Sequence, residues 1–318
     1  MNTGRMNTEE GRPRKMTEAE FRELYERLRA GLMWHKSDRR GALNYLTPRQ
    51  TLAAASQVRH GRSVSLAAPI ESHAAQDNPH PAVHEMTGTA ADAGDDGLSF
   101  GTDRISMNVH GNADSHIDAL CHVMFDGALY NGVPAEAVGP SGAAELSIAV
   151  AKDGIAGRGV LLDIPAVRGT NWLEPGDFVT VADLHAAEER QQVSFGQGDL
   201  LYIRVGHRRR RNERGPWDVA AARAGLHPSV MPLLAERRIA VLGSDSNSDT
   251  APSAVQGVDF PVHVLAINAL GLHLLDYLQF EELLPLCSQH GQWSFFCVIA
   301  PLRLPRGTGS PVNPIATL

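Results

Sequence analysis

The sequence has few cysteines, no long apolar run and no excess of basic residues. Its cysteines, Cys121, Cys287 and Cys297, are too widely spaced for a disulfide framework or a paired-cysteine zinc motif, so a reducing, cytoplasmic location is expected. No stretch approaches the about eighteen consecutive apolar residues of a membrane-spanning helix. The formal net charge is −7, whereas proteins that bind a nucleic-acid backbone are usually basic. Neither a membrane nor a nucleic acid is therefore expected as a partner.

The N-terminal residues also lack the apolar segment of a secretory signal peptide. Residues 1–16 are polar and charged, and we expect them to form a disordered leader. Apolar residues then recur at helical spacing over residues 17–32, with Thr17 and Glu20 placed as in a capping box. This pattern predicts an amphipathic helix that begins after Thr17.

A second helix is predicted where Pro48 follows Thr47, and it should stop at Gly61. The two helices define an N-terminal helical segment over residues 17–60. One large domain over residues 61–318 should follow, because the chain is long for one domain and short for two large ones.

Beyond the helical segment, short apolar runs with β-branched or aromatic residues alternate with helical stretches. The runs predict strands over residues 63–70, 104–110, 159–164, 199–206, 239–245 and 293–300. Helices are predicted over residues 181–192, 228–238 and 261–278. This alternation is typical of an α/β protein with a largely buried sheet. Residues 71–100 show little periodicity and predict a long loop, and the basic run 207–215 predicts a solvated loop after a strand.

Three histidines and two aspartates fall within residues 108–122, NVHGNADSHIDALCH. If a strand ends near His110 and a helix starts near Asp118, then Asp118 and His122 share one helix face. A turn could aim His116 at the same point. Two imidazoles and a carboxylate suit a Zn²⁺ or Mn²⁺ ion that keeps one position open for water. A polar turn rich in His and Asp is the alternative, and spacing alone leaves both open.

The segment HGNADSHIDALCH resembles the signature HxGTHxDxxxH of the cyclase-like metal-dependent hydrolases, a family that includes kynurenine formamidase and isatin hydrolase. The match covers His116, Asp118 and His122. Further segments resemble the family over nearly the whole chain: GALNYLTP (41–48), GSDSNSD (243–249), HVLAINALGLHLLDYL (263–278) and APLRLPRGTGSPVNPIA (300–316). The resemblance implies a swivelling β/β/α fold with barrel-like mixed sheets and outer helices, here with an N-terminal helical extension, assembled as a homodimer or homotetramer.

The resemblance also implies one divalent ion, Zn²⁺ or Mn²⁺, bound by His116, Asp118 and one further ligand. Where the family has a ligand histidine four residues before His116, this chain has Asn112. We favour His110 as the ligand, because imidazole binds these ions far better than a neutral amide oxygen does. Asn112 stays open as the alternative. His122, the last histidine of the signature, is the first expected general base and acid.

Other residues are assigned roles by the same resemblance. His263 is a second candidate for proton transfer, with a histidine at a helix start as the alternative. Asp276, where the family usually has Glu, and Asp245, in a turn after a strand, could bind a second ion or support a ligand from behind. Candidate substrate-binding residues, each with packing or turn formation as its alternative, are Trp34, Asn44, Tyr130 and Asn131.

The implied activity is hydrolysis of a small molecule. Water activated by the metal would cleave a C–N amide bond in a cyclic amide or formamide, or open a lactone. A biosynthetic cyclase or dehydratase that uses the same metal as a Lewis acid is the alternative, and a difference of one water between substrate and product separates the two. A non-catalytic binding protein that kept the fold is a third hypothesis.

Overall fold

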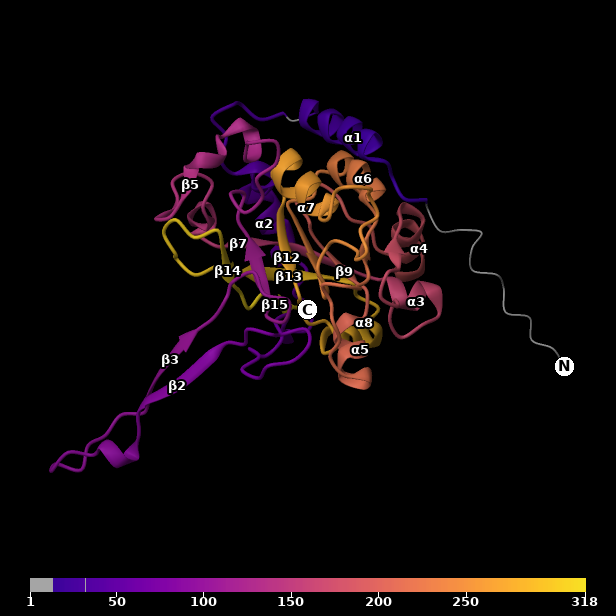
Figure 1. Ribbon diagram of the computed structural model, residues 1–318. Helices are drawn as coiled ribbons and strands as arrows, with labels where there is room; N and C mark the ends of the chain where they lie inside the picture. Colours follow the sequence, from indigo (N-terminus) through magenta and orange to yellow (C-terminus); the bar gives the residue numbers. More distant parts are fainter. Residues whose placement is uncertain (1–13, 32) are drawn as a thin grey trace.

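The computed structural model describes residues 14–31 and 33–318. Most of the predicted leader, and Leu32 of the predicted first helix, lie outside the described residues. A mixed sheet lies at the centre of the molecule (Figure 1). It has nine strands in the order β1-β15-β13-β7-β9-β11-β12-β4-β14. Its strands are β1 (Ser63–Ser65), β4 (His116–Asp118), β7 (Ile155–Asp163), β9 (Leu200–Arg204), β11 (Val241–Ser244), β12 (His273–Asp276), β13 (Ser294–Ile299), β14 (Gly309–Pro311) and β15 (Ile315–Thr317).

The middle of the sheet is parallel and buried. Strands β7, β9, β11 and β12 run parallel, and every residue of β9 and β11 is buried. Strands that are covered on both faces have continuous apolar sequences, which explains why the sequence predicted strands at LLYIR and VLGS. Strands β4, β13, β14 and β15 pair antiparallel on either side. The predicted α/β fold is therefore confirmed as a large curled sheet with outer helices.

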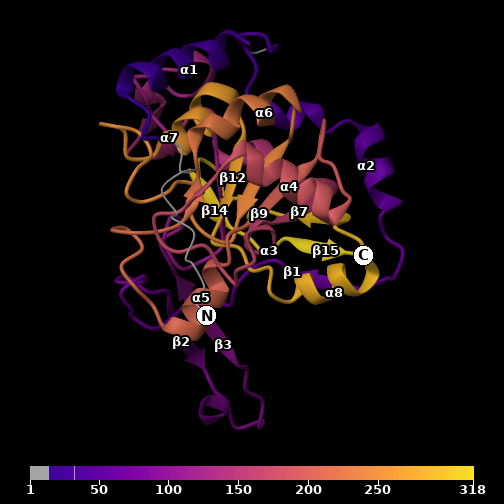
Figure 2. The ribbon, with the colours of Figure 1, turned by 90° about the vertical axis from the view of Figure 1, so that its right-hand side faces the viewer.

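Helices lie outside this sheet, as two perpendicular views show (Figures 1 and 2). The α-helices are α1 (Glu18–Ala30), α2 (Pro48–Ala55), α3 (Ile164–Arg168), α4 (Val181–Gln191), α5 (His207–Arg214), α6 (Met231–Glu236), α7 (Pro261–His263) and α8 (Leu283–His290). Helix α1 begins with the predicted capping box: the Thr17 amide donates to Glu20 Oε2 (2.8 Å), and the Glu20 amide donates to Thr17 Oγ1 (3.3 Å). None of these helices, within the described residues, is long and apolar enough to cross a bilayer.

Shorter elements complete the chain. The 3₁₀ turns are η1 (Gly41–Tyr45), η2 (Ala90–Asp92), η3 (Tyr130–Gly132), η4 (Ala135–Ala137), η5 (Ile148–Ala151) and η6 (Pro228–Val230), and η7 (Val264–Ala269) is a π-helix. Three small sheets pair β2 (Val83–Gly88) with β3 (Thr102–Ser106), β5 (Val138–Gly139) with β6 (Gly142–Ala143), and β8 (Phe178–Val179) with β10 (Gly225–Leu226). The predicted boundaries at residues 16 and 60 stay predictions.

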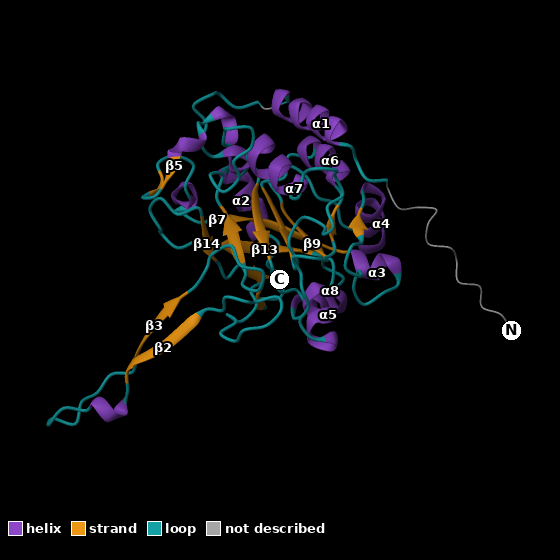
Figure 3. Cartoon of the chain, viewed as in Figure 1, coloured by secondary structure: helices purple, strands orange, loops and turns teal. Residues whose placement is uncertain are grey.

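The prediction of a loop over residues 71–100 was wrong, because this region contains strand β2 of a two-stranded arm. Strands β2 and β3 pair antiparallel and extend away from the body (Figure 3). The predicted strand 104–110 ends at Ser106. Nearly all residues of both strands are exposed. A strand with no buried face needs no alternation of apolar and polar residues, so the sequence carried no period to detect.

The basic run 207–215 was also misread as a solvated loop. Residues His207–Arg214 form helix α5, in which His207 and Arg208 are buried. Arginine and glutamate are good helix formers, and Arg209 pairs with Glu213 one turn later at 2.8 Å. The run is therefore a helix with a solvated face and a buried first turn.

Two predicted helices near the site were wrong as well. The helix expected to start near Asp118 is absent from the described residues: strand β4 ends at Asp118, and a turn follows. The helix expected over residues 261–278 ends at Ala269, and the chain turns at Gly271 (φ +65°) into strand β12. A side chain at Gly271 would collide with Tyr130, since an added Cβ would lie 2.5 Å from that ring. A uniformly apolar run does not distinguish a buried helix from a buried strand.

Candidate metal centre

Strand β4 places His116 and Asp118 on one face of the sheet. Side chains alternate along a strand, so residues two apart point the same way. The register pairs His116 with Asp276 on β12, which brings that carboxylate to the same face. Asp118 and Asp276 are fully buried, and His116 is 4 % exposed. Strand geometry, and not the predicted helix, therefore assembles this part of the site.

His122 and His110 complete one side of the site. After β4 the chain turns, with the His122 amide donating to the Ala119 carbonyl (2.9 Å). The His122 ring stacks on His110 with centroids 3.8 Å apart and an interplanar angle of 9°. His110 Nδ1 lies 2.8 Å from Asp118 Oδ1. Ligand atoms of His110, Asp118 and His122 all lie within 4.8 Å of one another.

A second group that shares Asp118 consists of His116, Asp118 and Asp276, again within 4.8 Å. His116 Nδ1 donates to the Asp114 carbonyl (2.9 Å), which leaves Nε2 as the bare nitrogen, 3.7 Å from Asp118 Oδ1. A backbone acceptor behind the ring is the usual way to orient a metal-binding histidine. Asp276 is held in turn by the Asn247 amide group (2.9 Å) and the Ser248 hydroxyl (2.8 Å).

His263 faces Asp118 from the end of helix α7. Its Nε2 lies 3.5 Å from Asp118 Oδ2 and 3.4 Å from Asp276 Oδ2. Its Nδ1 lies 2.6 Å from Asp249 Oδ2, and Asp249 also accepts the backbone N–H groups of Val262 and His263. Burial lowers the pKa of His263, but the carboxylates of Asp118, Asp249 and Asp276 outweigh it and raise that pKa well above its usual range.

Asp249 was missed by the sequence analysis. It is the last residue of the segment GSDSNSD, which resembles the family. Asp245 of the same segment was predicted as the supporting carboxylate instead. The two carboxylates differ in what they hold. Asp245 accepts the backbone N–H groups of Val205 (2.7 Å) and Gly206 (2.9 Å), and burial raises its pKa to about 6. Asp245 belongs to neither group of potential metal ligands among the described residues.

The electrostatics at Asp118 suit a cation. Burial raises the pKa of this carboxyl, but the surrounding imidazoles, His122 first, oppose that effect and hold the pKa well below its usual range. The Oδ2 atom is buried and accepts no hydrogen bond from the described residues, although His263 Nε2 lies 3.5 Å from it. A buried, ionised carboxylate oxygen beside several imidazoles belongs to a donor set that Zn²⁺ and Mn²⁺ take. The residues present therefore fit a divalent ion.

A cavity of about 620 Å³ opens over these side chains. Its polar side includes His110, His116, His122, His263, Asn112 and Asn247. Its apolar side consists of Val123, Met124, Phe125, Val258, Phe260 and Val264, and Glu18 and Arg22 of helix α1 also line it. A cavity of this size, largely apolar with a few convergent polar groups, is typical of a small-molecule site.

Asn112, the alternative ligand to His110, also lines this cavity. Its Oδ1 accepts the Tyr277 hydroxyl (3.1 Å), so the amide oxygen already has a partner. Both ring nitrogens of His110 also have partners, Asp118 Oδ1 at Nδ1 (2.8 Å) and Thr308 Oγ1 at Nε2 (3.0 Å). His110 is the residue of the two that contacts Asp118.

The candidate substrate-binding residues gather elsewhere, around Asp38. The Tyr130 hydroxyl donates to Asp38 Oδ2 (3.0 Å), the Asn44 amide group to Oδ1 (2.6 Å), and the Asn131 amide group to the Asp38 carbonyl (3.2 Å). Trp34 packs against Tyr45, with ring centroids 5.0 Å apart. None of these candidates lines the cavity over the histidines.

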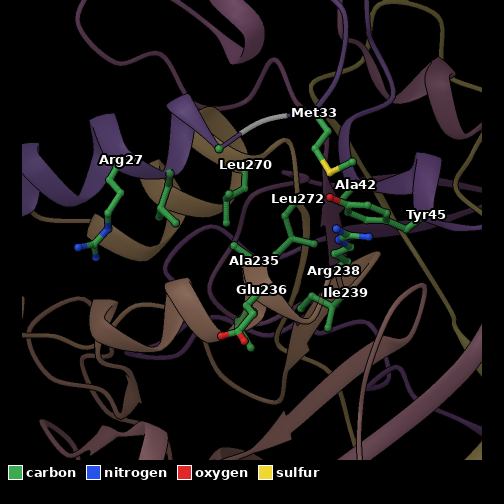
Figure 4. Close-up of a pocket in the computed structure, with 13 residues that line it drawn as sticks. Arg27, Met33, Ala42, Tyr45, Ala235, Glu236, Arg238, Ile239, Leu270 and Leu272 are labelled. Carbon is green, nitrogen blue, oxygen red and sulfur yellow. The ribbon is translucent and has the colours of Figure 1, made fainter.

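A second cavity, of about 340 Å³, lies beside this region (Figure 4). It is lined by residues of α1, η1 and α6 together with Leu270 and Leu272, and Arg27, Tyr45 and Arg238 are among them. Among the described residues, none of the clustered histidines or aspartates lines it.

Comparison with known proteins shows to which family the chain belongs. Residues 53–249, more than half of it, match the family described as "Putative cyclase", and the chain belongs to that family. A crystal structure described as a novel cyclase shares 34% identity and a TM-score of 0.82, covering 92% of this chain and 99% of its own. A search of curated proteins gave no match.

More distant structures share the fold. Isatin hydrolase A from Ralstonia solanacearum is 21% identical, with a TM-score of 0.58, covering 85% of this chain and 97% of its own. Isatin hydrolase A from Labrenzia aggregata, bound to benzyl benzoate, is also 21% identical, with a TM-score of 0.54, covering 84% of this chain and 97% of its own.

Proposed function

We propose that the protein is a metal-dependent hydrolase that cleaves a C–N amide bond in a cyclic amide or formamide, or opens a lactone. The buried Asp118 carboxylate carries this proposal. One of its oxygens accepts no hydrogen bond from the described residues, and the surrounding imidazoles line a cavity of small-molecule size. The fold shared with isatin hydrolases supports the same reaction class.

Asp118, which both groups share, would hold one ion, Zn²⁺ or Mn²⁺, together with His110 of the first group and His116 of the second. Such an ion lowers the pKa of a water molecule and polarises a substrate carbonyl. The hydrogen bond from His116 to the Asp114 carbonyl keeps the His116 ring in the orientation that binding requires. Asp276 supports the group from β12, and we propose no second ion.

His122 is suited to accept a proton. Burial lowers the pKa of His122 to about 4, so the ring is neutral near pH 7. It lines the cavity, where it can take a proton from water and deliver it to the leaving nitrogen or oxygen. His263, held through Nδ1 by Asp249, is positioned for a second transfer on the opposite side of Asp118.

We also propose a homodimer or homotetramer. The exposed arm supports this, because Val83, Met86, Phe100 and Ile105 are each at least half exposed, and an isolated two-stranded hairpin is at best marginally stable in water. In such an assembly a neighbouring subunit could bring Trp34 to the cavity. Light scattering during size-exclusion chromatography tests the assembly, and a clean monomer would contradict it. The three free, buried cysteines support the predicted cytoplasmic location.

The reaction class is tested with purified full-length protein loaded with Zn²⁺ or Mn²⁺. Formamides, isatin-like lactams and lactones are offered in H₂¹⁸O, and the products are analysed by mass spectrometry. Hydrolysis predicts a product heavier than the substrate by one labelled water, or an ¹⁸O-labelled acid fragment. His116→Ala should abolish the reaction.

A cyclase or dehydratase is the second candidate function. It is favoured by the 34% identical structure described as a cyclase. Products that have lost water, or that have the mass of the substrate and no label, would favour it over hydrolysis.

A further inference from the structure

Arg208 is a buried cation that forms no salt bridge with the described residues, although the carboxylates of Asp245 and Asp114 lie near enough to favour its charge. It lies in the first turn of α5, and it is 5 % exposed. Burial lowers the pKa of Arg208 to about 10, so the guanidinium still carries its charge near pH 7. Burying a charge without a direct ion pair is costly unless hydrogen bonds compensate for the lost water.

Backbone carbonyls supply those hydrogen bonds. Nη2 donates to the carbonyl of Ala113 (2.6 Å) and to that of Tyr277, and Nε donates to the carbonyl of Leu278 (3.2 Å). A guanidinium presents its N–H groups in a rigid planar fork, which lets one side chain bridge separate strands of backbone. A lysine ammonium has no such fork.

The bridged carbonyls belong to the two segments that carry the metal centre. Ala113 lies between His110 and His116, and Tyr277 directly follows Asp276. Two further bonds join the same segments: the Ser115 hydroxyl donates to the Tyr277 carbonyl (2.6 Å), and the Tyr277 hydroxyl donates to Asn112 Oδ1 (3.1 Å). Arg208 is the only charged side chain among the described groups that make these hydrogen bonds between the two segments.

We propose that Arg208 is a positioning residue that sets the separation between the His110–His116 loop and the Asp276 strand, and thereby the affinity for the divalent ion. The proposal rests on the proposed function, since it requires that the site binds an ion. Groups that orient metal ligands from behind typically change metal affinity by about 10–100-fold when they are removed.

Arg204 provides a matched control. It is equally buried, 3 % exposed, and lies four positions earlier, on β9. Its guanidinium pairs with Asp163 (2.9 Å) and Glu281 (2.8 Å) and donates to the Asn171 carbonyl (3.2 Å). None of these contacts reaches the two segments of the metal centre, so its loss should reduce stability without loosening the site.

The experiment compares the full-length wild type with Arg208→Lys, Arg208→Met and Arg204→Met. Three properties are measured: thermal unfolding of the metal-free proteins, Zn²⁺ affinity by competition with a chelator, and the visible absorption spectrum with Co²⁺. Both Arg208 variants should bind Zn²⁺ about 10–100-fold more weakly and show an altered Co²⁺ spectrum. Arg204→Met should lower the melting temperature while keeping the wild-type affinity and spectrum.

The proposal is overturned if the Arg208 variants bind Zn²⁺ as the wild type does, or if Arg204→Met weakens binding as much as Arg208→Met. If Arg208→Met does not fold, Arg208→Lys decides, because it keeps the charge and loses only the fork. A wild type that binds no ion would instead overturn the proposed function, and this inference with it, so the two failures are distinguishable.

Discussion

The Nε2 atom of His263 lies 3.5 Å from Oδ2 of Asp118, and that oxygen accepts no hydrogen bond from the described residues. A buried carboxylate oxygen that accepts no hydrogen bond leaves room for a positive partner of Asp118. The positive partner can be a proton on His263 or a metal ion, and the imidazoles on the other side of Asp118 favour the ion.

His122→Gln should leave the ion in place and slow the reaction. We assign His122 to proton transfer, and loss of a general base typically reduces turnover by about 10²–10⁴-fold. The measurement is kcat with metal content determined on the same sample. Full turnover by His122→Gln would exclude the role, and a loss of the ion would make His122 a ligand.

Asp249→Asn tests the partner of His263. An asparagine offers one acceptor oxygen where Asp249 now receives Nδ1 of His263 and two backbone N–H groups. We expect kcat to fall by about 10–100-fold, with metal content unchanged. Asp245→Asn is the control, since Asp245 binds backbone amides at the end of β9 and should affect stability and not turnover.

His110→Ala and Asn112→Ala distinguish the two possible ligands. His110 is hydrogen-bonded to Asp118, whereas the oxygen of Asn112 accepts the Tyr277 hydroxyl. We therefore expect the larger loss of Zn²⁺ affinity in His110→Ala, measured by chelator competition. The reverse order would make Asn112 the ligand.

His273 should make stability depend on pH. It is fully buried, neither ring nitrogen forms a hydrogen bond with the described residues, and burial lowers its pKa to about 4. The unfolded chain takes up this proton near pH 6.5 and the folded protein does not, so stability is present above pH 6.5 and is lost as the pH falls toward 4. Linkage predicts a loss of about 2 kcal/mol from this group between pH 7 and pH 5.

The measurement for His273 is chemical denaturation of metal-free protein at both pH values. His273→Leu removes the titrating group, so its stability should fall by about 2 kcal/mol less than that of the wild type over the same range. Equal losses in the two proteins would show that His273 does not titrate in this way.

The sequence predicted the residues of the site more accurately than the secondary structure in which they lie. His116 and Asp118 are two residues apart, which places them on one face of a strand, yet the same spacing was compatible with the helix that we predicted. Their convergence with Asp276 depends on the pairing of β4 with β12, which are separated by more than 150 residues. Pairing at that range has no local signal in a single sequence.

Arg208 shows a different limit. Four arginines follow His207, and composition indicated solvent exposure for all of them. The helix buries only its first turn, and which arginine is buried depends on where α5 meets the loop that contains Ala113. Strand β2 of the arm was missed for the opposite reason, since its residues are exposed and no buried face imposes a pattern on them.

Metal content tests the central claim most directly. Full-length wild type, His116→Ala and Asp118→Asn are stripped with a chelator, incubated with Zn²⁺ or Mn²⁺, desalted and analysed by mass spectrometry for metals. The proposed site predicts about one ion per chain in the wild type and almost none in either variant. A wild type that stays free of both ions, or variants that retain a full complement, would contradict it.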